Sequence, residues 1–177
     1  MEKKSCLYCD GPMNMPRRDA KFCSQKCGTY YRRELKRSSI PAELTSRARW
    51  VRRSALKRPL TVSGKAASST DSRTWSTYSE ALASKAGVGL GFVLGDGIGC
   101  YDLDHCLTGG VPDSWVPEFI ASIPERVIFA EVSQGGDGVH LFVEAQEGPG
   151  RKIRDGRNIE RYTAGRYIAM TGKSFII

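Results

Sequence analysis

The most informative segment of this chain is Ile98-Gly-Cys-Tyr-Asp102-Leu-Asp104-His105, which indicates both a strand and a site. Its first half is apolar and predicts a buried strand, and its second half carries two aspartates separated by one leucine. Because successive side chains of a strand point to opposite faces, Asp102 and Asp104 share one face, about 7 Å apart. Two such carboxylates repel each other unless a cation lies between them, and hard oxygen ligands favour Mg²⁺ or Mn²⁺. The alternative is a strand that runs out into a solvated turn, where aspartate is common.

A glycine-rich stretch follows, Glu131-Val-Ser133-Gln-Gly-Gly-Asp-Gly-Val-His140. Its glycines let backbone amides approach an anion, and the Ser133 hydroxyl adds a donor. His140 opens the next expected strand, from which it would touch a triphosphate from the side. Tight turns need glycine in any case, and a lone histidine is more often structural than functional.

A third stretch, Asn158-Ile-Glu160-Arg-Tyr, precedes Gly165-Arg166-Tyr-Ile-Ala-Met-Thr-Gly. On a strand, Glu160 would complete a three-carboxylate metal site, and Arg166 would meet a phosphate. The alternatives are a surface position for Glu160 and a salt bridge for Arg166. For each motif alone, the structural interpretation is favoured over the functional one. The three motifs together, in this order, favour a functional site.

The remaining segments predict an α+β fold with a mainly antiparallel sheet and helices on one side. In the first half we expect a helix at 42–53, a loop at 59–75, a helix at 78–86 capped by Ser76-Thr77, and strands at 90–94 and 98–102. In the second half we expect a helix at 114–123, a hairpin of 127–132 with 139–143, and a hairpin of 158–162 with 166–170 turning at Gly165.

Four cysteines near the N-terminus have the spacing of a metal site. Two short-spaced pairs, separated by 13 residues, place four sulfur atoms for a tetrahedral Zn²⁺ ion: Cys6, Cys9, Cys23 and Cys27. Such a closed site stabilises a fold and performs no chemistry, and the alternative is four unrelated thiols. The second pair is also compatible with the first turn of a helix running through Tyr31. Cys100 is expected in the core of its strand.

The positive charge is concentrated at the N-terminal side. The 177 residues carry a net charge of +8, but residues 1–60 hold 16 Lys/Arg against 5 Asp/Glu. This distribution indicates a nucleic-acid partner, because basic residues release counterions from phosphates, and the alternative is a solvated face. A membrane surface is the weaker choice, since the segment has no strong apolar face. The basic clusters lie near Tyr30, Tyr31 and Trp50, at Arg32-Arg33, Lys36-Arg37 and 47–53.

No apolar run reaches the roughly 20 residues of a membrane span. The N-terminus, Met-Glu-Lys-Lys-Ser, does not lead into an apolar segment, so we expect no signal peptide and a cytoplasmic location. Thiols or metal ligands are then expected in place of disulfides.

Taken in order, the three motifs resemble those of bifunctional DNA primase/polymerases, in the phage and plasmid branch of the archaeo-eukaryotic primase superfamily. The similarity runs over about residues 50–172 and includes the stretch from Asp71 to Ala81, which resembles the segment before the first motif. The resemblance implies a core with an RNA-recognition-motif-like sheet and nucleotidyl transfer by two metal ions. It also implies roles for particular residues: Asp102 and Asp104 as metal ligands, Glu160 as the third carboxylate, and His140 with Ser133 on the triphosphate.

The expected organisation is therefore a zinc-binding module at 1–37, a basic linker or helix at 38–58 and a primase/polymerase core at 59–177. By resemblance, the partners are a single-stranded DNA template, nucleoside triphosphates and a separate helicase, with no membrane. The zinc module resembles zinc ribbons of replication proteins that grip template DNA. The alternatives are a non-catalytic DNA-binding accessory protein on a degenerate primase core and a metal-dependent nuclease.

Overall fold

The computed structural model divides the chain into two compact units, Met1–Ser39 and Ile40–Ile177, and describes residues 6, 9, 11–13, 20–30 and 40–176. In the first unit, residues 25–30 form a helix. The predictions for Tyr31 and for the basic pairs at 32–33 and 36–37 lie outside the described residues. No helix within the described ranges combines the length and the apolar character needed to cross a membrane.

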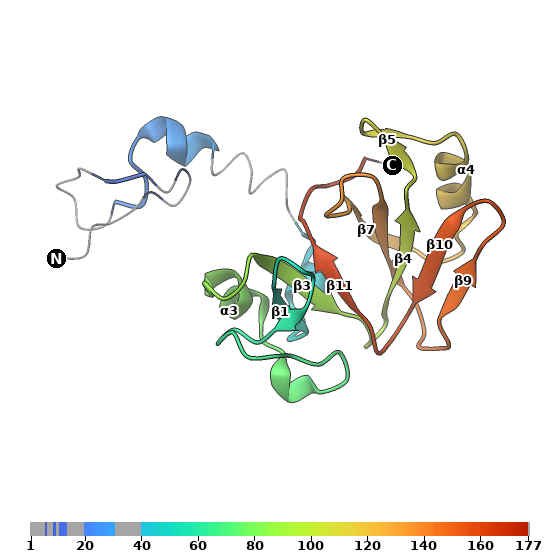
Figure 1. Cartoon of the computed structure of the whole chain (residues 1–177), viewed down its shortest axis with the longest axis horizontal. Coiled ribbons are helices and arrows are strands. Elements are labelled where there is room, and N and C mark those ends of the chain that lie inside the picture. The colour runs from blue at the N-terminus through green and yellow to red at the C-terminus, as the bar shows by residue number, and fades with distance from the viewer. Residues whose placement is uncertain (1–5, 7–8, 10, 14–19, 31–39, 177) are drawn as a thin grey trace. The chain divides into compact units, whose positions relative to one another are not determined.

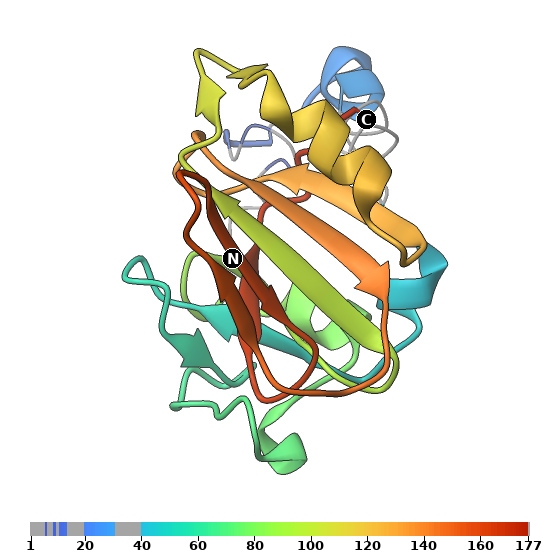
Figure 2. The same cartoon turned by 90° about the vertical axis from the view of Figure 1, so that its right-hand side faces the viewer.

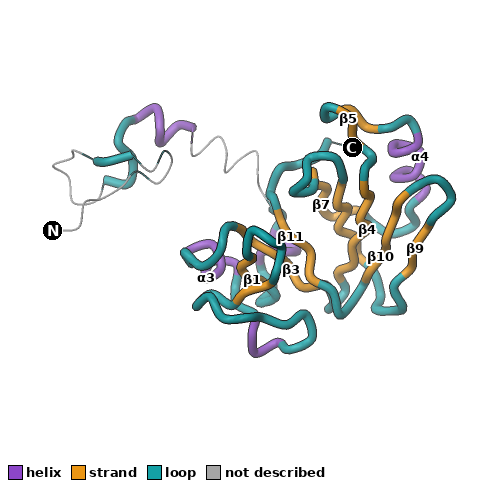
Figure 3. The backbone as a smooth tube through the Cα atoms, in the orientation of Figure 1, coloured by secondary structure: helices purple, strands orange, loops and turns teal. Residues whose placement is uncertain are grey.

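The second unit contains two larger antiparallel sheets, which Figure 3 shows as separate groups of strands. One sheet has four strands in the order β11-β3-β1-β2: β1 (Trp50–Arg53), β2 (Pro59–Leu60), β3 (Gly89–Val93) and β11 (Tyr167–Met170). The other has five strands in the order β7-β8-β4-β10-β9: β4 (Ile98–Asp104), β7 (Val127–Val132), β8 (Val139–Glu144), β9 (Arg151–Ile153) and β10 (Asn158–Tyr162). The expected α+β class with mainly antiparallel pairing is confirmed.

Short elements connect these strands (Figure 1). They are the helices α2 (Ala42–Thr45), η1 (Ser72–Thr74), α3 (Tyr78–Ala83) and α4 (Trp115–Ser122), and a small hairpin of β5 (Leu107–Thr108) and β6 (Val111–Pro112). The expected cap of α3 is confirmed, since the Thr77 hydroxyl accepts the Glu80 backbone N–H and the Glu80 carboxylate accepts the Thr77 N–H. The expected helix at 114–123 is α4, and the expected hairpin across 134–138 is β7 with β8.

Each face of the five-stranded sheet has its own apolar core. Figure 2 shows α4 lying across one face, where its buried Val116 and Ile120 pack with Leu103 of β4 and Leu141 of β8. The opposite face meets the four-stranded sheet through Phe142 and other buried side chains. The core between the two sheets contains fully buried side chains, among them Trp50, Phe92, Leu94, Cys100 and Phe142. One face is therefore closed by a helix, and the other carries the contact between the sheets.

The expected helix at 42–53 is partly wrong. Residues 42–45 are helical, whereas Trp50–Arg53 form β1, which pairs with both β2 and β3. Trp50 and Val51 are both fully buried although they are adjacent, and a strand buries neighbouring side chains on its two faces. Residues 40–58, expected as a basic linker or helix, therefore belong to the second unit and contribute a central strand.

The expected hairpin of 158–162 with 166–170 is wrong, although both strands exist. β10 pairs with β4 and β9, whereas β11 pairs with β3 in the other sheet. Between them, Gly165 adopts φ +65°, a left-handed conformation that favours glycine, and the chain crosses from one sheet to the other. Ile168 and Met170 of β11 are buried in the core between the sheets, which favours this crossing over a local turn.

Candidate active site

Four ionisable side chains form one row across the five-stranded sheet. Glu160 of β10 is paired with Asp102 of β4. On the other side of β4, Asp102 is paired with His140 of β8, which is paired in turn with Glu131 of β7. Directly opposed residues of antiparallel strands project to the same face, and Asp104, two residues beyond Asp102, shares that face. The sheet thus brings the three sequence motifs together.

Asp102 is a partly buried carboxylate whose ionised form is disfavoured. Its side chain is 26% exposed, and burial raises its pKa. The negative charges of Asp104 and Glu160 raise the pKa further, whereas His140 and Lys57 lower it. A divalent cation beside Asp102 would relieve this repulsion, and the carboxylate oxygens of Asp102 and Asp104 are donors that suit Mg²⁺ or Mn²⁺.

Glu160 is surrounded by donors and cations of its own. Its carboxylate accepts a hydrogen bond from the Tyr162 hydroxyl at 2.6 Å and lies 2.9 Å from Lys152 Nζ and 2.7 Å from Arg154 Nη2. These contacts, the Tyr162 bond first, lower the pKa of Glu160 to about 2. Arg166 adds a more distant contact at 3.7 Å. Glu160 is therefore ionised and already neutralised by neighbouring side chains.

The three predicted metal carboxylates share a face but do not form one compact ligand set. Within the described ranges, only the four cysteines bring three or more cysteine, histidine or carboxylate ligand atoms within 4.8 Å of one another. Asp102 and Asp104 share one face of β4, and their role as metal ligands stays a prediction. Glu160 would join them only by exchanging Lys152 and Arg154 for the metal.

His140 lies in the middle of the row and is 8% exposed at its side chain. Its Nδ1 is 3.0 Å from Oε1 of Glu131, and its Nε2 is 3.5 Å from Oδ1 of Asp102. Glu131 was not singled out from the sequence. The sequence does indicate it, because Glu131 is an acidic residue inside the otherwise apolar run Val127–Val132. A charge buried in such a strand requires hydrogen-bond or ionic partners.

A pocket of about 450 Å³ lies beside this row and is lined by residues of both sheets. Asp102 and His140 line it from the five-stranded sheet. Lys57 and Arg58, from the turn between β1 and β2, and Arg166, just before β11, contribute cations. The pocket therefore combines a carboxylate with positive side chains, an arrangement suited to a metal-chelated phosphate.

The turn that carries Lys57 and Arg58 is held by specific contacts. The Tyr167 hydroxyl donates to the Lys57 carbonyl at 2.9 Å, and the Ser54 N–H donates to the Arg58 carbonyl at 2.9 Å. The Tyr167 ring lies so close to β3 that a Cβ at Gly91 would be 2.2 Å from it. Lys57 and Arg58 carry no signal in the sequence, because only the pairing of β1 with β2 places them at the pocket.

The glycine-rich loop reaches the pocket through Gln134, whereas Ser133 is not among the lining residues. The Ser133 N–H donates to the Gly138 carbonyl at 2.8 Å, which closes the hairpin between β7 and β8. A Cβ at Gly138 would be 2.7 Å from the Leu103 carbonyl oxygen, so this position requires glycine. The predicted contact of Ser133 with a triphosphate stays a prediction.

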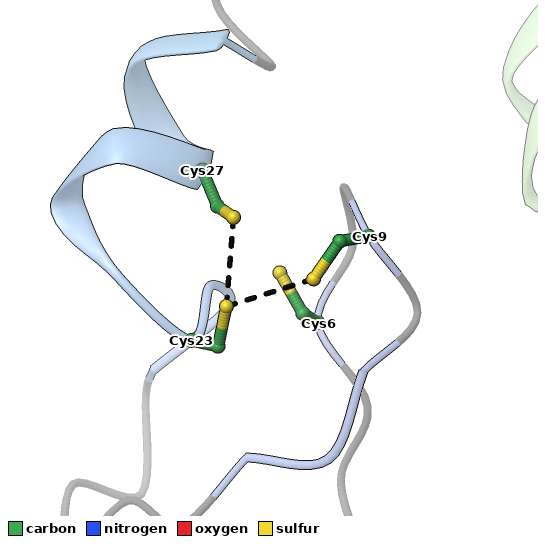
Figure 4. A group of neighbouring side chains, drawn as sticks. All are labelled: Cys6, Cys9, Cys23 and Cys27. Carbon is green, nitrogen blue, oxygen red and sulfur yellow. Dashed lines mark hydrogen bonds between the residues drawn. The ribbon is translucent and has the colours of Figure 1, made fainter.

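The N-terminal unit holds a second candidate centre, shown in Figure 4. The four predicted cysteine sulfurs lie close enough together to bind a metal such as zinc. Cys23 Sγ is 3.6 Å from Cys9 Sγ and 3.5 Å from Cys27 Sγ. Sulfurs at about 2.3 Å from a tetrahedral Zn²⁺ ion are about 3.8 Å apart, so the observed spacing fits this metal.

The surrounding thiols change the acidity of Cys23. Hydrogen bonds with Cys27, Cys9 and Cys6, in that order, raise the pKa of Cys23 to about 12. Without a metal, Cys23 therefore keeps its proton at neutral pH. Zinc binding requires thiolates, so binding would release protons.

Comparison with known proteins gives one informative similarity. No protein-family profile matches this chain. The chain is 36% identical over 123 residues to the DNA primase-polymerase of Nitratiruptor phage NrS-1. The match covers 63% of this chain and 17% of the phage protein, so the chain spans less than a fifth of that relative. The similarity supports the expected relationship to primase-polymerases.

We expect the cysteine cluster to bind about one Zn²⁺ per chain, with an affinity that rises with pH because the thiols must lose their protons. Cobalt substitution should give the absorption bands of a tetrahedral thiolate site. Cys23→Ser should abolish these bands, whereas Cys106→Ser, at a buried cysteine outside the cluster, should retain them. Equal metal content in the two variants would contradict this assignment.

Asp102→Asn should raise the thermal stability of the second unit at pH 7 when no Mg²⁺ or Mn²⁺ is added. Because the folded-state pKa of Asp102 is raised, its ionisation destabilises the fold as pH increases through that pKa. The gain should shrink below pH 4, where the wild-type carboxyl is protonated as well. All three tryptophans, Trp50, Trp75 and Trp115, belong to the second unit, so their fluorescence reports its unfolding. A variant less stable than wild type at pH 7 would contradict the expectation.

Proposed function

We propose that this chain is the nucleotidyltransferase core of a DNA primase/polymerase that copies a single-stranded DNA template in phage or plasmid replication. The observation that carries the proposal is the pocket in which Asp102 and His140 face the same space as Lys57, Arg58 and Arg166. The similarity to a phage protein named as a DNA primase-polymerase points in the same direction.

In this mechanism the pocket binds the triphosphate of an incoming nucleotide. Lys57, Arg58 and Arg166 supply positive charge to the phosphate oxygens. Asp102 and Asp104 would hold two Mg²⁺ or Mn²⁺ ions, one of which would activate the attacking hydroxyl while the other would neutralise the leaving pyrophosphate. The primer hydroxyl oxygen forms a bond to the α-phosphorus as the bond to the pyrophosphate oxygen breaks.

Two further residues of the row have supporting roles in the proposal. Nε2 of His140 contacts a triphosphate oxygen beside Asp102, which lies 3.5 Å away. Glu160 becomes the third carboxylate ligand when it exchanges its contacts with Lys152 and Arg154 for the metal. That exchange would also free Lys152 and Arg154 for the phosphates of a bound template or nucleotide.

The expected RNA-recognition-motif-like core corresponds, in this proposal, to the five-stranded sheet with α4 on one face. The cysteine cluster corresponds to a structural zinc site that helps to grip template DNA. The separate helicase stays a prediction, as does the domain limit at 37.

One observation favours the alternative of a non-catalytic DNA-binding accessory protein. The cations on Glu160 neutralise the carboxylate that catalysis would use, and they would serve equally well to bind phosphates once displaced from it. In that case DNA binding would be sensitive to salt and indifferent to Asp102 and Asp104.

The proposal is tested by nucleotide incorporation on a single-stranded template with Mg²⁺ or Mn²⁺, with and without a primer. Asp102→Ala and Asp104→Ala should each lower incorporation by about a thousand-fold or more, because a lost metal ligand removes several kcal/mol of transition-state stabilisation. Glu118→Ala, at an exposed position of α4, is the matched control and should retain activity. Incorporation that survives in both aspartate variants would refute the proposal.

Two other results would identify the alternatives. Tight, salt-sensitive DNA binding without incorporation by the wild type would indicate the accessory protein. Shortening of the DNA in the absence of nucleotides would indicate a nuclease.

Lys57→Ala/Arg58→Ala should raise the KM for nucleotide by about 10- to 100-fold, since each cation would contribute a charge-assisted contact to phosphate. The value of kcat should change much less, because neither side chain is placed on the reacting atoms. Lys65→Ala/Lys85→Ala removes the same amount of charge at exposed positions away from the pocket. Equal KM values for the two double variants would exclude the pair from the nucleotide site.

A further inference from the structure

We propose that the hairpin of β9 and β10, residues 151–162, is a binding surface for single-stranded DNA, and we call it the basic hairpin. The identification of that strand as the template rests on the proposed function. The contribution of the hairpin to DNA binding does not, because it is measured without nucleotide and without added Mg²⁺ or Mn²⁺.

The basic hairpin concentrates positive charge in an otherwise acidic part of the chain. Residues 61–177 carry 11 Lys/Arg and 14 Asp/Glu. Five of these cations lie in the hairpin, at Arg151, Lys152, Arg154, Arg157 and Arg161, against Asp155 and Glu160. Cations gathered in one short segment in this way are the electrostatic footprint of a polyanion, such as the phosphate backbone of a nucleic acid.

The carboxylates of the hairpin leave part of this charge without a counterpart. The Glu160 carboxylate lies 2.9 Å from Lys152 Nζ and 2.7 Å from Arg154 Nη2, so two cations share one negative charge. Arg151 is exposed and joins none of the ion pairs found among the residues that the structure describes. The surplus of positive charge is therefore available to phosphates.

The basic hairpin extends the row of the candidate site to the edge of the sheet. Lys152 of β9 is paired with Glu160 of β10, which is paired in turn with Asp102 of β4. Directly opposed residues of antiparallel strands project to the same face, so Lys152 shares the face of Asp102. Because β9 is an edge strand, as Figure 1 shows, this face leads from the pocket to solvent. A DNA strand that passes the pocket would meet these cations as it leaves.

An aromatic ring beside these cations provides a surface for bases. Tyr162, at the end of β10, lines the pocket, and the Arg166 guanidinium lies 4.4 Å from the centre of its ring. A Cβ at Gly150 would be 2.8 Å from this ring, so the glycine makes room for it. Aromatic rings and arginine planes stack unpaired bases with little regard to sequence, and their combination with cations is typical of single-strand binding. A duplex keeps its bases stacked inside, so this surface favours a single strand.

Glu160 competes with DNA for the cations of the hairpin. A phosphate that contacts Lys152 or Arg154 must take it from this carboxylate. A glutamine at position 160 retains an oxygen that can accept the Tyr162 hydroxyl, but it carries no charge. Glu160→Gln should therefore free both cations and strengthen DNA binding. A carboxylate that served only as a metal ligand would leave metal-free DNA binding unchanged.

The first measurement is the fluorescence anisotropy of a labelled single-stranded oligonucleotide. Arg151→Ala/Lys152→Ala should weaken its binding about 10-fold and reduce the salt slope by about 1.4, since each lost phosphate contact removes about 0.7. Lys65→Ala/Lys85→Ala removes the same charge at exposed positions outside the hairpin and is the control. Equal affinities of the two double variants would overturn the proposal. An equal loss on a duplex of the same length would overturn the preference for a single strand.

The second measurement applies the same assay to Glu160→Gln, which should bind the oligonucleotide about 3- to 10-fold more tightly than the wild type at low salt. Glu144→Gln removes a carboxylate that is likewise paired with an arginine, Arg126 at 2.6 Å, and it measures the effect of one lost negative charge elsewhere on the sheet. An increase no larger than that of Glu144→Gln would contradict the competition for the hairpin cations.

These results separate this inference from the proposed function. A wild type that incorporates no nucleotide would overturn the function, and the anisotropy would still decide the role of the hairpin. Incorporation by a protein whose DNA binding ignores the hairpin variants would overturn the inference alone. Tryptophan fluorescence verifies that each variant is folded, which we expect for Arg151→Ala/Lys152→Ala because both side chains are exposed.

Discussion

A buried carboxylate holds the two sheets of the second unit together at the candidate site. Leaving the Glu131 charge without partners in the interior would be strongly destabilising, so its position requires the N–H donors that surround it. Its carboxylate lies 3.0 Å from Nδ1 of His140 on β8 of the five-stranded sheet, and its backbone donors are Thr171 and Gly172, directly after β11 of the four-stranded sheet. The contact continues through the Thr171 hydroxyl, which donates to the Val132 carbonyl at 2.7 Å. These contacts tie the end of β7 to the segment that follows β11 beside the candidate site.

The second constraint acts at the opposite wall of the pocket. Because Gly91 has no side chain, the Tyr167 ring can lie directly on β3, and its hydroxyl anchors the turn that carries Lys57. The chain reaches β11 only by leaving β10 and crossing between the sheets. The same crossing therefore delivers Arg166 to the pocket, Tyr167 to its anchor and Thr171 to Glu131.

Periodicity and motif spacing predicted those parts of the structure that depend on local sequence. The strand of Asp102, the hairpin that leads to His140, the capped helix α3 and the four gathered cysteines follow from patterns within a few residues. The partition into two sheets did not follow, because pairing partners far apart in the chain decide it. For the same reason, the sequence alone predicts a helix where β1 lies. Nothing near Lys57 and Arg58 in the sequence indicates that they share a pocket with Asp102.

The charges of the site are arranged for a ligand more than for stability. Among the ion pairs of the residues that the structure describes, none joins Lys57 or Arg58 to a carboxylate, although Lys57 is near enough to lower the pKa of Asp102. Direct pairing would relieve the burial and repulsion that Asp102 bears, yet the pocket keeps the two signs of charge apart. A metal-chelated triphosphate would satisfy both, with its cation on the aspartate side and its phosphates on the side of the basic turn. Glu160, by contrast, pairs directly with Lys152 and Arg154, so its charge is neutralised without a ligand.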